Sequence, residues 1–178
     1  MRYLKIIAVL LLMAFPDFGK CLAQDMTHPR LILRKGEETA LAANISKDVI
    51  WSRLHEIVLE ESERLLEIPE QKYKLGVRKA MHGQCCETVR RMLFIAYSYR
   101  MTGDRRFLDK AEKIILNMCA LDSWNPYHFL DVAELTVAAS FAYDWLYDDL
   151  KPSTRKLLME SIRDKALTAS ETGGGGNK

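Results

Sequence analysis

Residues 124–128 gather side chains that could bind a carbohydrate: Trp124, Asn125, Tyr127 and His128. An indole ring can stack on the flat face of a sugar, and amide or imidazole groups can hydrogen-bond its hydroxyls or a carboxylate. Because Pro126 follows Asn125, the same segment could instead shape a turn while Trp124 fills the core. These residues are therefore predicted to form a substrate-binding loop, with a structural turn as the alternative.

A second candidate is the sequence His82-Gly83-Gln84, which precedes an expected helix. We expect it to open on the same end of the molecule as residues 124–128. A histidine there can change its charge near neutral pH and contact an acidic sugar, although a solvated or capping histidine would have the same sequence. Positive charge for such a ligand, or simply a solvated face, could come from Arg78, Lys79, Arg90 and Arg91.

The acidic and sulfur-containing residues do not have the spacing that glycoside hydrolysis or a common metal-binding motif requires. Asp131 and Glu134 share one face of an expected helix, whereas glycoside hydrolysis needs two carboxylates that face each other across a cleft. Asp131 is therefore interpreted as a helix cap. Neither Cys-x-x-Cys nor His-x-x-x-His spacing occurs, and Cys85, Cys86 and Cys119 are interpreted as small buried residues. We expect no metal and no cofactor.

The elements that must position these residues are helices, because apolar residues recur at helical spacing and strand signals are nearly absent. Helices are expected at about 48–67, 84–101, 104–118, 129–147 and 153–167. Asp48 and Asp104 can cap two of them, and Gly103 can end another. More apolar helices begin near 84 and 129, and more charged ones near 105 and 153, which gives offsets of 45 and 48 residues. This repeat predicts an all-α fold in which inner–outer helical hairpins form part of an incomplete (α/α) toroid.

Residues 1–23 have the features of a cleavable secretory signal. Arg2 and Lys5 precede the apolar run 6–15, which is about half the roughly 20 residues that a membrane-spanning helix needs. An uncleaved anchor is the alternative. Removing three basic residues from 26 and one acidic residue from 24 leaves 23 of each, so the net charge is near zero. We expect a secreted or periplasmic protein with no nucleic-acid partner and no stable membrane insertion after cleavage.

The expected domain organisation is a signal peptide (1–23), a helical domain (24–168) and a flexible glycine-rich tail (169–178). Four consecutive glycines, residues 173–176, cannot hold a helix and are typical of a linker or an expression scar. Two or three hairpins would leave an apolar flank uncovered, and that flank could mediate self-association.

Four stretches of the chain share the order and spacing of one enzyme family. They are His28–Leu33 (HPRLIL), Tyr99–Asp104 (YRMTGD), Trp124–Glu134 (WNPYHFLDVAE) and Ala142–Leu150 (AYDWLYDDL). Together they span most of residues 28–168. In these stretches the chain resembles the N-terminal helical domain of the heparinase II/III-like polysaccharide lyases.

The resemblance implies an incomplete α/α toroid, normally followed by a β-sandwich domain, in an enzyme that cleaves uronate-containing glycans such as glycosaminoglycans by β-elimination. A base removes the proton beside the carboxylate, and the leaving oxygen departs from the neighbouring carbon. The reaction needs Asn or His to neutralise the carboxylate and Tyr or His as acid and base.

In the family, an Asn-Asn-Trp-Asn type segment follows the helix that ends here near Ala166, whereas this sequence continues into glycines. No catalytic residue is therefore assigned. We expect the chain to bind an acidic, uronate-containing polysaccharide without cleaving it alone. The expected binding residues are Trp124, Asn125, Tyr127, His128, His82 and Gln84. A non-catalytic glycan-binding module and a helical-repeat interaction module remain as alternatives.

Overall fold

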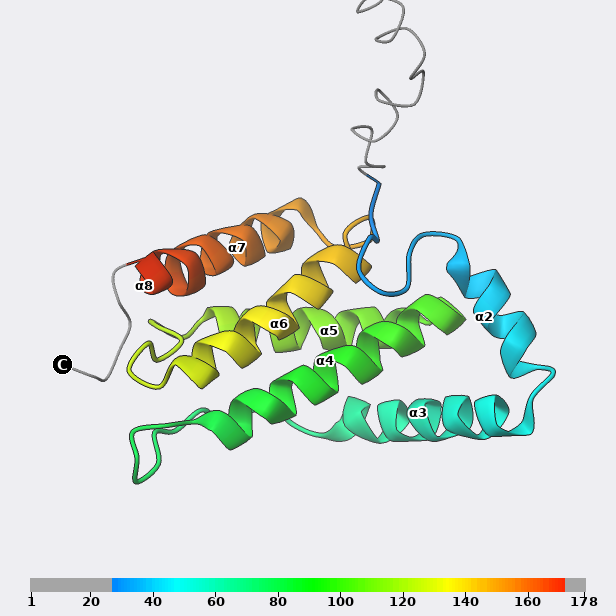
Figure 1. Ribbon diagram of the computed structural model, residues 1–178, viewed down its shortest axis with the longest axis horizontal. Helices are drawn as coiled ribbons and strands as arrows, with labels where there is room; N and C mark the ends of the chain where they lie inside the picture. The colour runs from blue at the N-terminus through cyan, green and yellow to red at the C-terminus, as the bar shows by residue number, and fades with distance from the viewer. Residues whose placement is uncertain (1–26, 172–178) are drawn as a thin grey trace, which may run out of the picture.

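The computed structural model describes residues 27–171, and within them every regular element is a helix (Figure 1). The predicted all-α fold class is therefore confirmed. The helices are α2 (Glu37–Ile45), α3 (Val49–Glu67), α4 (His82–Thr102), α5 (Arg105–Cys119), α6 (Phe129–Trp145), α7 (Pro152–Ile162), the π-helical turn η2 (Arg163–Leu167) and α8 (Thr168–Glu171). Helix α2 is an addition to the predicted helices.

Two predictions concern the chain ends. The signal peptide expected over residues 1–23 and the glycine run 173–176 lie outside the described residues. At the other boundary, α7 continues through η2 into α8, so the domain end predicted at residue 168 falls inside a helix. None of the described helices is both long and apolar enough to cross a membrane.

Three helix ends form where the sequence predicts them, at Asp48, Gly103 and Asp104. The Asp48 carboxylate accepts hydrogen bonds from the backbone of Ile50 and Trp51, and Asp104 accepts one from Arg106. These contacts satisfy N–H groups that have no partner within the helix. Gly103 ends α4 in the left-handed conformation with φ of 70°, which a residue without Cβ adopts at little cost.

Helices α4 and α6, which we call the inner helices, run in the same direction, and α3, α5 and α7 run in the opposite direction (Figure 1). The pairing of α4 with α6 is the most extensive between any two described elements. Small residues on α6, including Ala138, Ala139 and Ala142, are fully buried and allow close approach. Because α4 and α6 pack side by side and run in the same direction, they begin at the same end of the molecule. The inner–outer order of the hairpins and their closure into part of a toroid stay predictions.

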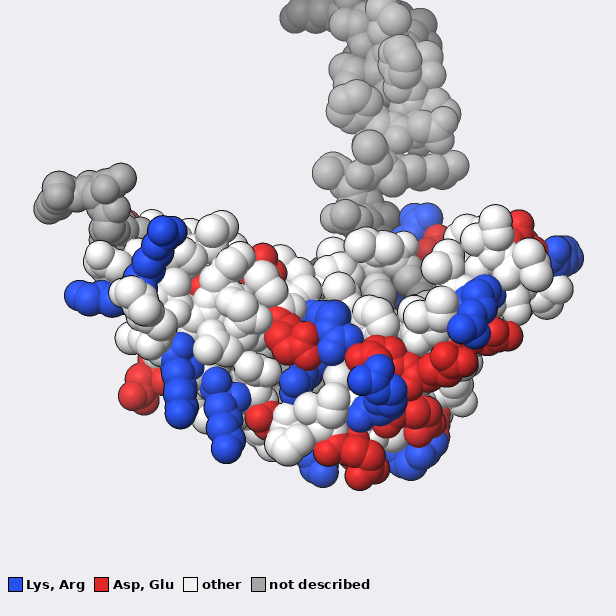
Figure 2. All heavy atoms as spheres, turned by 90° about the horizontal axis from the view of Figure 1, so that it is seen from below, with Lys and Arg blue, Asp and Glu red and all other residues white. Residues whose placement is uncertain are grey.

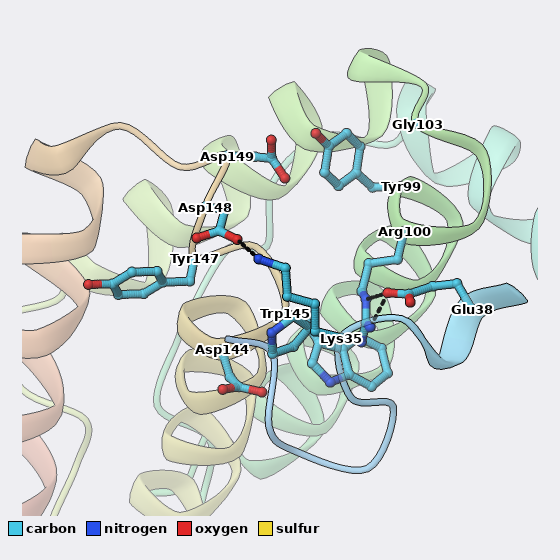
Figure 3. A pocket seen from close by; sticks show the side chains of 11 residues that line it. Lys35, Glu38, Tyr99, Arg100, Gly103, Asp144, Trp145, Tyr147, Asp148 and Asp149 are labelled. Carbon is cyan, nitrogen blue, oxygen red and sulfur yellow. Dashed lines mark hydrogen bonds and ion pairs between the residues drawn. The ribbon is translucent and has the colours of Figure 1, made fainter. Parts of the chain in front are cut away.

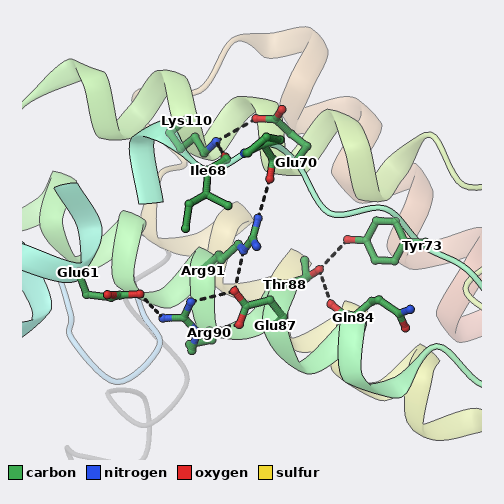
Figure 4. Close-up of polar contacts among 11 residues, drawn as sticks. Glu61, Ile68, Glu70, Tyr73, Gln84, Glu87, Thr88, Arg90, Arg91 and Lys110 are labelled. Atoms are coloured by element: carbon green, nitrogen blue, oxygen red, sulfur yellow. Dashed lines mark hydrogen bonds and ion pairs between the residues drawn. The ribbon is translucent and has the colours of Figure 1, made fainter. Parts of the chain in front are cut away.

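The loop between α3 and α4 is held by charged side chains of α4 and α5 (Figure 4). The buried ammonium of Lys110 donates to the carbonyl of Ile68 and to Glu70, and Arg91 donates to the carbonyl of Pro69. Farther along the loop, the Tyr73 hydroxyl is 2.6 Å from that of Thr88 (Figure 4). These contacts fix the chain just before His82, the first residue of α4.

Two arginines of α4 are neutralised within the same group of contacts (Figure 4). Hydrogen bonds from Arg90 and then Arg91 lower the pKa of Glu87 to about 2. Arg90 also donates to Glu61 on α3. Arg90 and Arg91 are therefore committed to holding helices together, and only Arg78 and Lys79 remain from the predicted set of cationic ligand contacts.

The outward surface carries charges of both signs. On the face shown in Figure 2, Lys and Arg side chains are interleaved with Asp and Glu over much of the surface. Charged side chains here form ion pairs, including Arg64 with Glu61 within α3 and Arg106 of α5 with Glu63 of α3. Such a mixed face creates no extended field of one sign, in agreement with a net charge near zero.

The apolar spacing along α3 predicts one buried face over the whole helix, but the apolar residues of its first half are exposed. Leu65 near the end of the helix is fully buried, whereas an apolar group at its start is exposed. The exposed group consists of Val49, Ile50, Trp51, Leu54 and Ile57. We call these residues the α3 apolar face. It is an uncovered apolar flank of the kind that the hairpin repeat predicts.

Candidate functional site

The buried carboxylate of Asp131 joins the two loops that lead into α4 and α6. It is fully buried and accepts hydrogen bonds from the backbone N–H of Met81 at 2.8 Å and from Asn125 Nδ2 at 2.7 Å. His128 Nδ1 lies 2.9 Å from its other oxygen. The prediction that Asp131 caps its own helix is therefore wrong, because His128 is the N-cap residue of α6 and no side chain caps that helix. Asp131 instead ties the start of α6 to the start of α4.

This arrangement brings the two predicted binding segments together. The rings of His82 and His128 have centroids 5.9 Å apart. Asn125 has a φ of 60° and donates from Nδ2 to the carbonyl of Lys79 at 2.7 Å, so its side chain also crosses between the loops. The two segments therefore lie at the same end of the molecule, as expected. The prediction that His82, Gly83 and Gln84 precede the helix is wrong, because α4 begins at His82 and these residues form its first turn.

Trp124 has a different role from the predicted sugar-stacking one. Its side chain is fully buried, and Nε1 donates to the carbonyl of Met118 at 3.0 Å. Burial removes a large apolar ring from water while its one polar atom keeps a partner, which favours the core position. A ring with no exposed face cannot stack on a ligand, so the core-filling alternative holds for Trp124.

The exposed aromatic residue of this loop is Tyr127. Its exposed fraction is 59%, and the ammonium of Lys79 lies 5.3 Å from the centroid of its ring. The Tyr127 ring can therefore offer the stacking surface that the sequence assigns to Trp124. Gln84 is half-buried, and its Nε2 donates to the carbonyl of Lys74 at 3.3 Å, a contact that holds the preceding loop.

Sequence reasoning missed a cluster one turn into α4. His82, Cys86 and Glu134 each place one potential ligand atom within 4.8 Å of the others. Cys86 Sγ lies 3.5 Å from His82 Nε2 and 3.7 Å from Nδ1. Burial, followed by the nearby Glu134 carboxylate, raises the pKa of the Cys86 thiol. The available signal was a histidine four positions before a cysteine on one helix, a spacing that a search for Cys-x-x-Cys and His-x-x-x-His omits.

The opposite end of the inner helices contains a cavity of about 240 Å³ (Figure 3). Its charged lining is internally paired, because Lys35 lies 3.0 Å from Asp148 and Arg100 is bonded to Glu38. The Arg100 guanidinium also lies over the Trp145 ring at 5.2 Å. These contacts connect the segment before α3 to the ends of α4 and α6. We interpret the charged residues around the cavity as structural contacts that hold these segments together.

A second cavity, of about 380 Å³, lies beside His28 and includes Tyr143 and Asp144 in its lining. The His28 ring stacks on Tyr147 with centroids 4.1 Å apart and meets the edge of Tyr143 at 5.7 Å. Asp144 accepts from the backbone of Arg30 as well as contacting His28. His28 is thus packed on two rings and held by a buried carboxylate, which favours a structural role.

No protein-family model matches this chain, and no curated protein is a significant match to it. The likeness to heparinase II/III-like lyases therefore rests on the four sequence stretches. The structure brings two of these, 28–33 and 142–150, into direct contact.

Proposed function

We propose that the chain is the N-terminal helical segment of an exported polysaccharide lyase, and that it binds uronate-containing glycans at the start of α4 and α6. The observation that carries the proposal is the meeting of Tyr127 and His128 with His82 at one end of the inner helices. Two segments distant in sequence, held together by Asp131, there bring an exposed aromatic ring and two partly exposed imidazoles to one surface.

The exposed groups suit an acidic sugar. The Tyr127 ring can stack on a pyranose, and imidazole N–H groups can donate to hydroxyls or to a carboxylate. The loop before α4 adds positive charge through Lys72, Lys74, Arg78 and Lys79, which are exposed and form no ion pair with another described residue. Unpaired surface cations raise the local concentration of an anionic polymer.

The proposal assigns glycan binding, rather than proton transfer, to this segment. β-Elimination needs an acid and a base beside a neutralised carboxylate, and the resemblance assigns these to hairpins beyond the four matched stretches. We therefore expect the chain to retain a uronate polymer without producing unsaturated uronate.

Affinity electrophoresis or calorimetry with heparin, heparan sulfate, chondroitin sulfate and alginate tests the binding, with a neutral glucan as the reference polymer. We expect binding to at least one uronate polymer and weaker binding to the glucan. Tyr127→Ala should weaken binding by up to about tenfold, because a stacked ring contributes about 0.5–1.5 kcal/mol and 1.4 kcal/mol corresponds to tenfold. Trp51→Ala is the matched control, since it removes an exposed aromatic side chain from the α3 apolar face.

Glycan binding and the absence of cleavage are tested separately. Absence of binding to all four polymers, or equal loss in Tyr127→Ala and Trp51→Ala, would contradict the glycan-binding surface. Absorbance of unsaturated uronate measures cleavage in the same samples, and sustained turnover would contradict the binding-only role.

The α3 apolar face supports a second candidate, a helical-repeat interaction module that self-associates. Clustered exposed apolar residues of this kind are typical of interaction surfaces. Sedimentation velocity should then show a dimer that Ile50→Glu converts to a monomer, whereas a wild-type monomer at all concentrations would contradict this candidate.

A further inference from the structure

We propose that His82, Cys86 and Glu134 form a binding site for a divalent transition-metal ion of the Zn²⁺ class. The site lies where the first turns of α4 meet α6. This assignment is independent of the glycan proposal, although both use His82, because its test uses the metal alone.

The backbone holds the three residues in a convergent arrangement. His82 and Cys86 are four positions apart on α4, which places their side chains on one face of the helix. Glu134 projects from α6, the helix that packs most extensively on α4. Their potential ligand atoms lie within 4.8 Å of one another, and all three residues are half-buried.

The distances are close to those of a bound ion. Zn²⁺ binds sulfur at about 2.3 Å and imidazole nitrogen or carboxylate oxygen at about 2.0–2.2 Å, so ligand atoms in a tetrahedral site are about 3.4–3.7 Å apart. The 3.5 Å between Cys86 Sγ and His82 Nε2 already falls in this range. The Glu134 carboxylate can complete the set by a side-chain movement of about 1 Å.

The donor set selects the class of ion. Imidazole, thiolate and carboxylate are the three ligand types of zinc sites, whereas Mg²⁺ and Ca²⁺ take oxygen ligands and gain nothing from Cys86. On binding, the Cys86 thiol loses its proton to solvent, and the thiolate and the Glu134 carboxylate together balance the two positive charges of the ion.

The surroundings of the cluster supply a further feature of metal sites. Three protein ligands leave a fourth position for water or another group. His128 lies beside His82 and has its Nδ1 against the buried Asp131 carboxylate at 2.9 Å. A carboxylate behind an imidazole is the arrangement that orients metal-binding histidines, and it leaves the other ring nitrogen available.

Titration of the chelator-treated full chain with Co²⁺ tests the site, because a thiolate ligand gives cobalt a sulfur-to-metal charge-transfer band. We expect saturation at one ion per chain, displacement by Zn²⁺, and no displacement by Mg²⁺. Cys86→Ser should remove the band and weaken Zn²⁺ binding by at least about tenfold. Glu134→Gln should keep the band and weaken binding.

Matched controls use residues of the same types outside the cluster. Cys85→Ala changes the adjacent cysteine, which is fully buried in the core, and His55→Gln changes a histidine bonded to Tyr97. Both should bind Co²⁺ like the wild type. Circular dichroism checks that each variant is folded. If Cys86→Ser does not fold, the weaker binding expected for Glu134→Gln tests the site.

The proposal fails if the wild type shows no thiolate band at saturating Co²⁺. It also fails if Cys86→Ser and Glu134→Gln both bind as tightly as the wild type, or if Cys85→Ala removes the band. A wild-type chain that binds glycan but no metal would overturn only this inference, and a wild-type chain that binds metal but no glycan would overturn only the proposed function.

Discussion

His28 and Asp144 are 116 positions apart, and His28 Nδ1 lies 2.6 Å from Asp144 Oδ1. The second carboxylate oxygen accepts from the backbone N–H groups of Arg30 and Leu31, each at 2.8 Å. Trp145 Nε1 donates to the Leu31 carbonyl at 2.8 Å. The HPRL stretch and the AYDW stretch therefore contact each other directly, and these hydrogen bonds hold the segment before α2 against the end of α6.

Asp144→Asn should destabilise the protein by about 2 kcal/mol, because hydrogen bonds to a charged acceptor contribute about 1.5–3 kcal/mol each and an amide retains only part of them. Urea unfolding followed by circular dichroism measures the change. Asp148→Asn is the control, since it alters an exposed ion pair with Lys35 and should cost less than about 1 kcal/mol. Equal losses of stability in the two variants would show that the buried contacts of Asp144 contribute no more than an exposed ion pair.

The same carboxylate should make stability depend on pH. Burial alone raises the pKa of Asp144, but hydrogen bonds from Leu31 and Arg30 and the contact with His28 lower it more, so the pKa lies below its usual value. A lowered pKa in the folded state stabilises the protein above the unfolded value of about 4, and this contribution is lost as the pH falls through the folded value.

The free energy of unfolding, measured between about pH 6 and pH 2, should therefore fall more steeply in the wild type than in Asp144→Asn. The two curves should converge at the acidic end. Parallel curves over the whole range would contradict the assigned role of Asp144.

Truncation of Trp124 should destabilise the protein far more than truncation of Tyr127. Trp124→Ala is expected to cost about 3–5 kcal/mol, because it leaves a cavity where a fully buried ring stood. Tyr127→Ala should cost less than about 1 kcal/mol, since that ring is mostly exposed. Thermal unfolding of the two variants compares them directly, and a larger loss for Tyr127→Ala would reverse the assignment of core and surface.

Asp131→Asn should loosen the junction of the two loops, because the carboxylate accepts from Met81, Asn125 and His128 in a buried position. We expect a loss of about 2–4 kcal/mol and faster amide exchange at the starts of α4 and α6. Asp109→Asn, on the exposed face of α5, should change neither quantity. Unchanged exchange in Asp131→Asn would mean that packing alone holds the loops.

Prediction from sequence is accurate where a structure depends on neighbours within one turn. The caps at Asp48 and Asp104, the helix end at Gly103 and the amphipathic pattern of α5 are of this kind, because each needs only residues two to four positions away. Helix α2 escapes prediction because it has neither a capping side chain nor a continuous apolar face.

The amino-acid sequence by itself determined an all-helical chain, the helix ends at Asp48, Gly103 and Asp104, and the positions of His82 and His128 near the starts of two helices. Only the tertiary structure decided that Trp124 is core, that Tyr127 is surface, and that Glu134 meets His82 and Cys86. These outcomes depend on how α6 packs against α4 and on which side chains the closed loops bury. Contacts between residues some 50 positions apart leave no periodic trace in the chain, since they arise from the fit of two helix faces.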